Sequence, residues 1–256
     1  MKKAFFLLIL TMTQLYSCGN RQPNVNEGED MIGNTYYNLP GDSTRYGMAC
    51  DGCTDSVLVF MPVSCDRLDT FDIITARQQR RVFGRPHIGD ELAIIVNPED
   101  TLEVLTVINL DALRNTWAYL AYPKLRNIDK MTQRMQRHMM ERIPDSLKEQ
   151  WLKPREYSLR LKRDHTAMAL GGVHRQTTTD DMSRVEFPPI KRYTEWYIYN
   201  GRLILKADTI AGFTQEGNKP TIDTVEIKTL RRDTLVLRFS DHEQSYYRKE
   251  QNTSNN

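Results

Sequence analysis

The sequence lacks most of the features that directly indicate a function. No apolar run approaches the roughly 20 residues of a membrane-spanning helix. The formal charge is only +2, because 35 Lys and Arg nearly balance 33 Asp and Glu, so no one-sided basic field indicates nucleic-acid binding. The G-x-S-x-G and H-E-x-x-H motifs and phosphate-binding glycine loops are absent, which favours a protein without enzymatic activity or a cofactor.

The first 18 residues have the pattern of an export signal. A basic start at Met1–Lys3 is followed by the apolar stretch Ala4–Leu10, and Leu15–Cys18 reads L-Y-S-C. A basic tip, a short apolar stretch and a small residue before the end predict a signal peptide over 1–17. The ending resembles a bacterial lipobox, which implies that Cys18 is lipidated and anchors the protein stably in the outer membrane. An ordinary signal peptide with a chance cysteine is the alternative.

Composition divides the rest of the chain into four segments. Residues 18–45 are polar with little to bury, so they predict a flexible tether, and the sequence leaves open whether it places the protein on the periplasmic or the surface side. Hydrophobic residues make up 39% of the chain, which is adequate for a core. We expect a small β domain over 46–110, a second domain over 111–250 and a disordered tail over 251–256.

Two of the four cysteines lie three positions apart at a predicted turn. Cys50 and Cys53 enclose Asp51-Gly52, a strong turn pair, and a β-turn brings its first and last Cα atoms within about 7 Å. A disulfide across this turn is geometrically allowed, and an exported chain can keep it. Catalytic thiol chemistry would need the pair at a helix N-terminus, whereas a strand pattern follows here.

Metal binding is the other interpretation of these cysteines. Cys50, Cys53, Cys65 and His87 could supply four zinc ligands, but their spacing fits no standard zinc module, and His87 beside Pro86 is expected to be a surface residue. Two thiolates with Met48 nearby would suit Cu(I). The stretch Y-G-M-A-C-D-G-C-T-D-S-V-L-V-F resembles the opening of the NlpE-type envelope lipoproteins, although it departs from them at Met48-Ala49. That resemblance implies copper or redox handling, or envelope stress sensing.

Strand patterns fill the first domain. The apolar runs are Ser56–Pro62, Thr70–Thr75, Glu91–Asn97 and Thr101–Leu110, with Gly, Pro, Asn and Asp turn signals between them. They predict a small antiparallel, barrel-like β domain.

Eight strand patterns follow in the second domain. They are Asn115–Ala121, Glu156–Lys162, Thr166–Leu170, Tyr193–Tyr199, Arg202–Asp208, Asp223–Leu230, Asp233–Ser240 and Gln244–Arg248. Several alternate strictly between apolar and polar residues, which indicates one buried and one solvated face. Asn200-Gly201 favours a type I′ hairpin turn. Eight consecutive strands predict a meander that closes into a barrel with room for side chains or one small ligand. His165 and His174, at strand ends, are expected to be solvated.

This second domain resembles the lipocalin-like domains of Bacteroidetes lipoproteins. The resemblance is carried by Leu113–Leu120, Tyr193–Leu205, Ile227–Leu237 and Tyr246–Lys249. It implies an interior pocket for a small apolar ligand, with Arg248 packed over Trp117 at one end through a cation–π contact. The pocket candidates are Trp117, Tyr119, Leu159, Trp196, Leu205 and Leu237.

The segment Asn127–Pro144 predicts one amphipathic helix that covers the barrel, with Asp129 as a possible N-cap and Pro144 as its end. Its stripe of Ile128, Met131, Met135 and Met139 is typical of adaptable packing. Two alternatives stay open. Met131, Met135, His138 and Met139 could form a Cu(I) site, or the helix could lie on lipid headgroups.

These patterns together predict a mainly β, membrane-anchored envelope lipoprotein that is not an enzyme. We expect it to bind a small hydrophobic ligand or to act in envelope sensing. The alternatives are copper or redox handling and a structural role in an outer-membrane assembly. The sequence does not identify the ligand or the oligomeric state, because a barrel interior is generic apolar surface.

Overall fold

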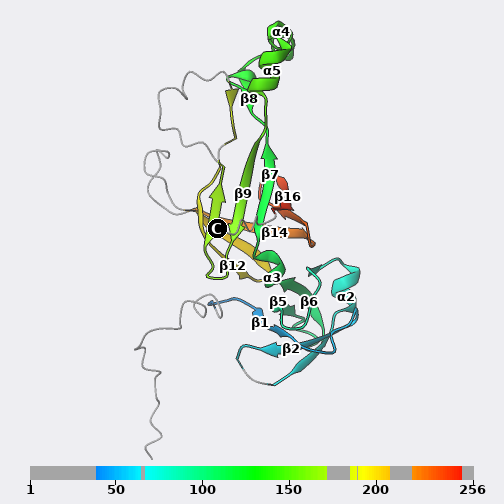
Figure 1. Cartoon of the computed structure of the whole chain (residues 1–256). Helices are drawn as coiled ribbons and strands as arrows, with labels where there is room; N and C mark the ends of the chain where they lie inside the picture. The colour runs from blue at the N-terminus through cyan, green and yellow to red at the C-terminus, as the bar shows by residue number, and fades with distance from the viewer. Residues whose placement is uncertain (1–38, 65–66, 172–184, 189, 208–220, 250–256) are drawn as a thin grey trace, which may run out of the picture. The chain divides into compact units, whose positions relative to one another are not determined.

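The computed structural model describes residues 39–64, 67–171, 185–188, 190–207 and 221–249 (Figure 1). The predicted signal peptide, most of the tether, the C-terminal tail, Cys18, Cys65 and His174 lie outside these ranges. Within them, no helix combines the length and the apolar character required to cross a bilayer.

The first sheet forms a small barrel. Its elements are β1 (Thr44–Ala49), β2 (Val57–Pro62), β3 (Asp69–Asp72), α2 (Ile74–Gln78), β4 (Val82–Phe83), β5 (Glu91–Val96) and β6 (Val104–Asn109). The strand order is β3-β2-β1-β5-β6-β4, and a parallel bridge between Asp72 and Glu103 brings β3 back to the start of β6. Without the two-residue β4, the other five strands close in this order and α2 follows the third, which is the topology of an OB-fold. β1 begins two residues before the predicted boundary at Tyr46.

Two details of this barrel differ from the sequence prediction. The predicted strand over 70–75 ends at Asp72, because the Asp72 carboxylate accepts the Ile74 N–H at 2.7 Å and α2 begins there, with Ala76 facing the core. The sheet is also not purely antiparallel, since β4 pairs with β6 in parallel. Glycine is required at Gly47, where a Cβ would lie 2.2 Å from the Met61 carbonyl oxygen.

The second sheet contains all eight predicted strands. They are β7 (Thr116–Ala121), β9 (Arg155–Leu161), β10 (Ala167–Leu170), β12 (Tyr193–Tyr199), β13 (Arg202–Ala207), β14 (Thr221–Leu230), β15 (Thr234–Arg238) and β16 (Glu243–Arg248). Each pairs antiparallel with its neighbours along the chain in the order β10-β9-β7-β16-β15-β14-β13-β12. The first and last strands meet, with Trp117 opposite Arg248. A bridge between Thr166 and Glu195 links β10 to β12, so the meander is a nearly closed barrel, as predicted.

The segment between β7 and β9 forms an arm rather than the single predicted helix. It contains β8 (Lys124–Leu125), a 3₁₀ turn η2 (Ile128–Lys130), α4 (Gln133–Arg142) and α5 (Asp145–Trp151), and β8 pairs with β11 (Val185–Glu186). Thr132, not Asp129, caps α4, because its hydroxyl accepts the Met135 N–H at 3.4 Å. Ile143 is extended ahead of Pro144, which separates the two helices. No described residue of α4 or α5 is buried, so the methionines do not pack over the barrel.

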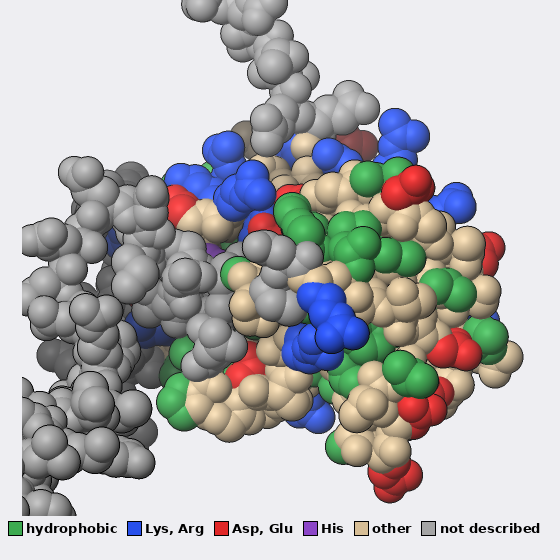
Figure 2. Space-filling view, turned by 90° about the horizontal axis from the view of Figure 1, so that it is seen from below, with side chains coloured by type: hydrophobic (Ala, Val, Ile, Leu, Met, Phe, Trp, Pro, Cys, Tyr) green, Lys and Arg blue, Asp and Glu red, His purple; other side chains and the backbone are tan. Residues whose placement is uncertain are grey.

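The two barrels share apolar packing. One buried cluster, which includes Phe60, Leu58 and Ile94, belongs to the first barrel alone. The larger cluster fills the second barrel and continues into Tyr46, Ala93 and Ile108 of the first. On the face shown in Figure 2, hydrophobic side chains occur in small patches among charges of both signs.

The chain that leads into β1 is attached to the second barrel. The Tyr199 hydroxyl donates to the Pro40 carbonyl at 3.1 Å, and the Asn200 N–H donates to the Asp42 carboxylate at 2.8 Å. The Tyr46 hydroxyl donates to the Ile198 carbonyl at 2.8 Å. Asn200 and Gly201 both have positive φ, as the predicted hairpin turn requires, so this turn and the entry to the first barrel are joined.

Candidate functional site

The six predicted pocket residues face the interior of the second barrel. Period-two alternation places them on one face of their strands, and Trp117, Leu159, Trp196, Leu205 and Leu237 are each at most 3% exposed. Tyr119 packs against the same buried cluster. The structure therefore brings these six side chains together inside the barrel.

One end of this barrel is closed by α3 (Leu110–Leu113) and by two indoles. The Trp117 indole N–H donates to the Leu113 carbonyl at 2.8 Å, and the Trp196 indole N–H donates to the Lys162 carbonyl at 2.9 Å. We call this the tryptophan end. The expected stacking of Arg248 over Trp117 is wrong: Arg248 is exposed at the end of β16 and reaches the Arg232 carbonyl. The guanidinium that lies over an indole is that of Arg114, 6.0 Å from the Trp196 ring.

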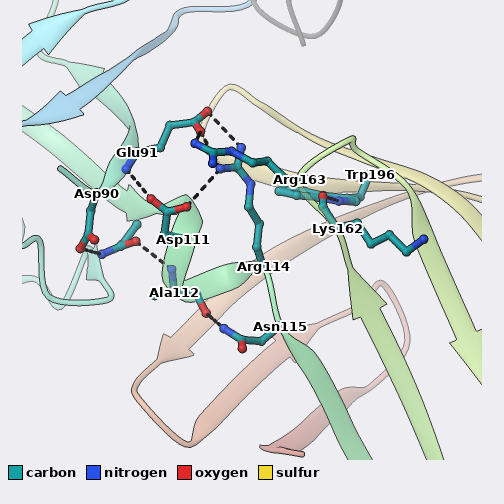
Figure 3. A network of polar contacts seen from close by, with 10 residues as sticks. Asp90, Glu91, Asp111, Ala112, Arg114, Asn115, Lys162, Arg163 and Trp196 are labelled. Carbon is teal, nitrogen blue, oxygen red and sulfur yellow. Dashed lines mark hydrogen bonds and ion pairs between the residues drawn. The ribbon is translucent and has the colours of Figure 1, made fainter. Parts of the chain in front are cut away.

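A polar network joins the tryptophan end to the first barrel (Figure 3). The Arg114 guanidinium binds both carboxylate oxygens of Glu91, at 2.5 and 3.0 Å, and reaches Asp111 at 3.3 Å. The Asp111 carboxylate also accepts the Glu91 N–H at 2.7 Å, and Arg163 lies 3.7 Å from Glu91. The Arg114 and Glu91 side chains are only 6% and 12% exposed, so this bidentate pair is a buried structural contact. Sequence reasoning missed it, because its partners are far apart along the chain.

His165 is buried at the tryptophan end, contrary to the solvated position expected from the sequence. Its ring nitrogen Nδ1 lies 3.1 Å from the Trp196 carbonyl oxygen, and its own carbonyl accepts the Trp196 N–H at 2.8 Å. Burial lowers the pKa of His165, and the nearby Arg114 charge adds to this effect, while the contact with the Trp196 carbonyl opposes it. His165 therefore helps to close the barrel between β10 and β12.

The opposite end of the barrel is lined by tyrosines. Tyr119, Tyr157, Tyr193 and Tyr246 come from four strands, and we call this the tyrosine end. The Tyr119 ring meets the Tyr157 and Tyr246 rings edge to face, with centroids 5.6 and 5.2 Å apart. Such pairs are favourable beyond the area that they bury. This end of the barrel is therefore lined by four phenol rings, whereas the other end is closed by α3 and two indoles.

Burial raises the pKa of all four tyrosines at this end, so their hydroxyls stay protonated. The Tyr193 hydroxyl donates to the Asp223 carboxylate at 2.8 Å, and Lys191 lies 2.7 Å from the same carboxylate. The Tyr157 hydroxyl donates to the Pro188 carbonyl at 3.1 Å. The tyrosine end can therefore offer neutral hydrogen-bond donors beside an apolar interior.

Chain connectivity also distinguishes the two ends. At the tryptophan end the strands are joined by short turns, such as Arg163–His165 and Asn200–Gly201. The other end is where β10 and β13 end, and the arm leaves from β7 there (Figure 1). Binding sites commonly lie where long loops meet a rigid barrel.

The predicted cysteine turn is present, but its disulfide is not formed. Cys50 and Cys53 are both free thiols, and Gly52 between them has a φ of 93°. The Cys53 sulfur lies 3.4 Å from both the backbone nitrogen and the carbonyl oxygen of Val59, so it is held against β2. His87 is exposed, as expected. In the described ranges, no three His, Cys, Asp or Glu side chains come together in a way that could hold a metal ion.

The predicted methionine set is not brought together on one helix. Met131 lies after η2 and before α4, whereas Met135, His138 and Met139 follow within α4. Met135 is 59% exposed. α4 contacts η2 through Gln136, whose side chain donates to the Ile128 carbonyl at 2.8 Å. A shallow hollow between them is lined by Ile128, Gln133, Gln136, Arg137 and Met140.

Comparison with known proteins identifies no family for this chain. No family model matches the sequence, and no curated protein matches it. Among solved structures, it is similar to a lipocalin-like protein from Bacteroides thetaiotaomicron VPI-5482, with 14% identity, 54% of this chain and 97% of that chain covered, and a TM-score of 0.28. The barrel assignment rests on the strand pairings of this chain itself.

Proposed function

We propose that this protein is a lipid-anchored envelope lipoprotein that binds a small, largely apolar ligand at the tyrosine end of the second barrel. The observation that carries the proposal is the asymmetry of that barrel. The tryptophan end is filled by α3 and hydrogen-bonded indoles, while the tyrosine end combines aromatic rings, an apolar interior and the base of the arm. An apolar site with a few convergent polar groups is the usual composition of a small-molecule site.

Binding of an environment-sensitive apolar dye tests this proposal. The full chain with Cys18→Ala is purified without detergent and titrated with N-phenylnaphthylamine, which fluoresces in apolar surroundings. We expect saturable binding of one dye per chain, and Tyr119→Ala should weaken it about tenfold, since one buried aromatic contact contributes on the order of 1.5 kcal/mol.

Tyr247→Ala is the matched control for this experiment. Tyr247 follows Tyr246 on β16 but faces outward, where its hydroxyl donates to Glu156 at 2.7 Å. The dye should bind this variant as it binds the parent chain. Absence of saturable binding, or equal weakening by both substitutions, contradicts a site at the tyrosine end. Mass spectrometry of an organic extract of the purified protein would then identify any natural ligand directly.

Anchoring through Cys18 has an independent test. Metabolic labelling with an alkyne fatty acid should mark the parent chain and not the Cys18→Ser variant, and only the parent should remain with the membrane fraction. Stable anchoring needs two or more acyl chains, and the proposed anchor carries them all on Cys18. Substitution of Cys18 should therefore remove the whole anchor and release the protein. Labelling that survives Cys18→Ser would refute this part of the proposal.

The cysteine turn supports a second candidate function, the binding of a soft metal such as Cu(I). The supporting observation is that Cys50 and Cys53 are both free thiols on one turn. Titration with Cu(I) under reducing conditions should give one bound ion per chain and none for Cys50→Ser. A Met135→Leu variant tests the methionine alternative, and no stoichiometric copper at either site would exclude this function.

A further inference from the structure

We infer that the ligand presents an uncharged hydrogen-bond acceptor, such as a carbonyl oxygen, to the hydroxyls of Tyr119 and Tyr246. This inference rests on the proposed function and specifies the ligand chemistry at the same site. The juxtaposition of two phenols from the neighbouring strands β7 and β16 carries it.

The hydroxyls of Tyr119 and Tyr246 differ from those of the other two tyrosines. Tyr157 and Tyr193 donate to Pro188 and to Asp223. Within the part of the chain that the structure describes, neither the Tyr119 nor the Tyr246 hydroxyl has a hydrogen-bond partner. Tyr246 is only 7% exposed, and its ring is fixed edge to face against that of Tyr119 at 5.2 Å.

Two donors of this kind favour a ligand that satisfies them. Neither hydroxyl is among the buried side-chain atoms that lack a partner in the described chain, so water can reach both before a ligand binds. A ligand that covers them displaces this water, and a covered polar group without a partner is unfavourable because it has lost its hydrogen bonds to water. A ligand that supplies an acceptor avoids this cost, whereas a ligand without one incurs it. The site therefore distinguishes two apolar molecules of the same shape by whether they carry a hydrogen-bond acceptor.

The surroundings favour a neutral acceptor over an anion. Asp223 is hydrogen-bonded to Tyr193 and paired with Lys191, and Arg155 stacks on the Phe187 ring at 4.1 Å, so these charges already have partners. A negative charge on the ligand would lose its hydration. In the described ranges, no Lys or Arg stacks on Tyr119 or Tyr246 to compensate it. The edge-to-face rings further suit a flat, apolar body behind the acceptor.

Three related fluorophores separate these possibilities. Prodan carries a ketone on a dimethylaminonaphthalene ring, its parent lacks the ketone, and the corresponding naphthoate carries a carboxylate. Each is titrated against the full chain with Cys18→Ala and against its Tyr119→Phe, Tyr246→Phe and double variants. Tyr247→Phe is the matched control, because it removes an outward hydroxyl from the same strand.

We expect Prodan to bind more tightly than either relative. Each interior Phe substitution should weaken Prodan binding about two- to tenfold, the range that corresponds to one hydrogen bond, and should leave the parent ring unchanged. Tyr247→Phe should change neither. In the unsubstituted barrel the bound Prodan emission should be red-shifted relative to the double variant, since a hydrogen bond to the ketone stabilises its excited state.

The other outcomes contradict either this inference or the proposed function. If all three probes bind equally and the Phe variants change nothing, the acceptor inference is wrong and the proposed function stands. If the naphthoate binds most tightly, the acceptor is an anion and the inference is overturned. If no probe binds, the proposed function itself fails. The infrared carbonyl frequency of bound Prodan, measured without any substitution, decides the matter should a variant not fold.

Discussion

The two ends of the second barrel use aromatic residues in opposite ways. At the tryptophan end, both indole N–H groups donate to backbone carbonyls, and the buried Arg114–Glu91 pair fastens α3 to β5. At the tyrosine end, two of four hydroxyls bond within the described protein and two do not. Bonded indoles and a buried ion pair of this kind stabilise a fold, whereas hydroxyls without a protein partner can bond to a ligand. Substitutions at the tryptophan end should therefore lower the free energy of unfolding more than substitutions at the tyrosine end.

The largest effect is expected for Trp117→Ala. Trp117 is fully buried, contacts α3 through its indole, and lies on the strand that closes the barrel against β16. Its truncation should lower the free energy of unfolding by about 3–5 kcal/mol, because it leaves a large cavity. Urea denaturation measures this, with the exposed Met168→Ala as the control. A loss below about 1 kcal/mol would show that Trp117 does not hold this end together.

Arg114→Met should follow closely in size. The substitution leaves the Glu91 carboxylate buried without its bidentate partner, and removal of one partner of a buried ion pair costs about 3 kcal/mol or more. The double variant Arg114→Met with Glu91→Gln should recover part of the loss in the same denaturation experiment. Equal loss in the single and double variants would contradict the coupling between these two side chains.

A smaller effect is expected from pH, through His165. The pKa of His165 in the folded state is lowered by burial below its unfolded value of about 6.5, so the unfolded chain takes up the proton first on acidification. Stability from this group is present above pH 6.5 and is lost as the pH falls below it. His165→Gln should flatten the dependence of the urea midpoint on pH below about pH 6.5. Substitution of the exposed His87 by Gln should leave the dependence as it was.

The smallest effect on stability is expected at the tyrosine end. Tyr119→Phe and Tyr246→Phe remove hydroxyls without a partner in the described chain, so the unfolding free energy should change by less than about 1 kcal/mol or rise slightly. Tyr157→Phe, which loses the bond to Pro188, should be the more destabilising of the three. Thermal unfolding of the three variants side by side checks this order.

The barrel could be predicted from the sequence because period-two alternation is a local signal. Every strand of the second barrel begins and ends within two residues of its prediction. The predicted bounds are wrong where a side chain bonds to the nearby backbone. The Asp72 carboxylate does so at the start of α2, and the Thr132 hydroxyl does so at the start of α4. The alternation also cannot distinguish the two ends of a barrel, because inward positions alternate in the same way along the whole strand.

The polar contacts of the site could not be predicted for a different reason. Arg114 and Glu91 are 23 positions apart, and they meet only because α3 returns the chain to β5. His165 has a φ of 60°, which is uncommon for a residue other than glycine, in the short turn between β9 and β10, and its burial comes from β12 across the barrel. The tyrosines were visible in the sequence, but only the strand order brings Tyr119 and Tyr246 into contact.

The attachment of Pro40 and Asp42 to the Asn200–Gly201 turn has a consequence for how the described chain unfolds. The segment that enters β1 is bonded to a turn of the second barrel, so the start of the first barrel depends on that turn. Loss of the turn should therefore weaken the two barrels together, as one cooperative unit.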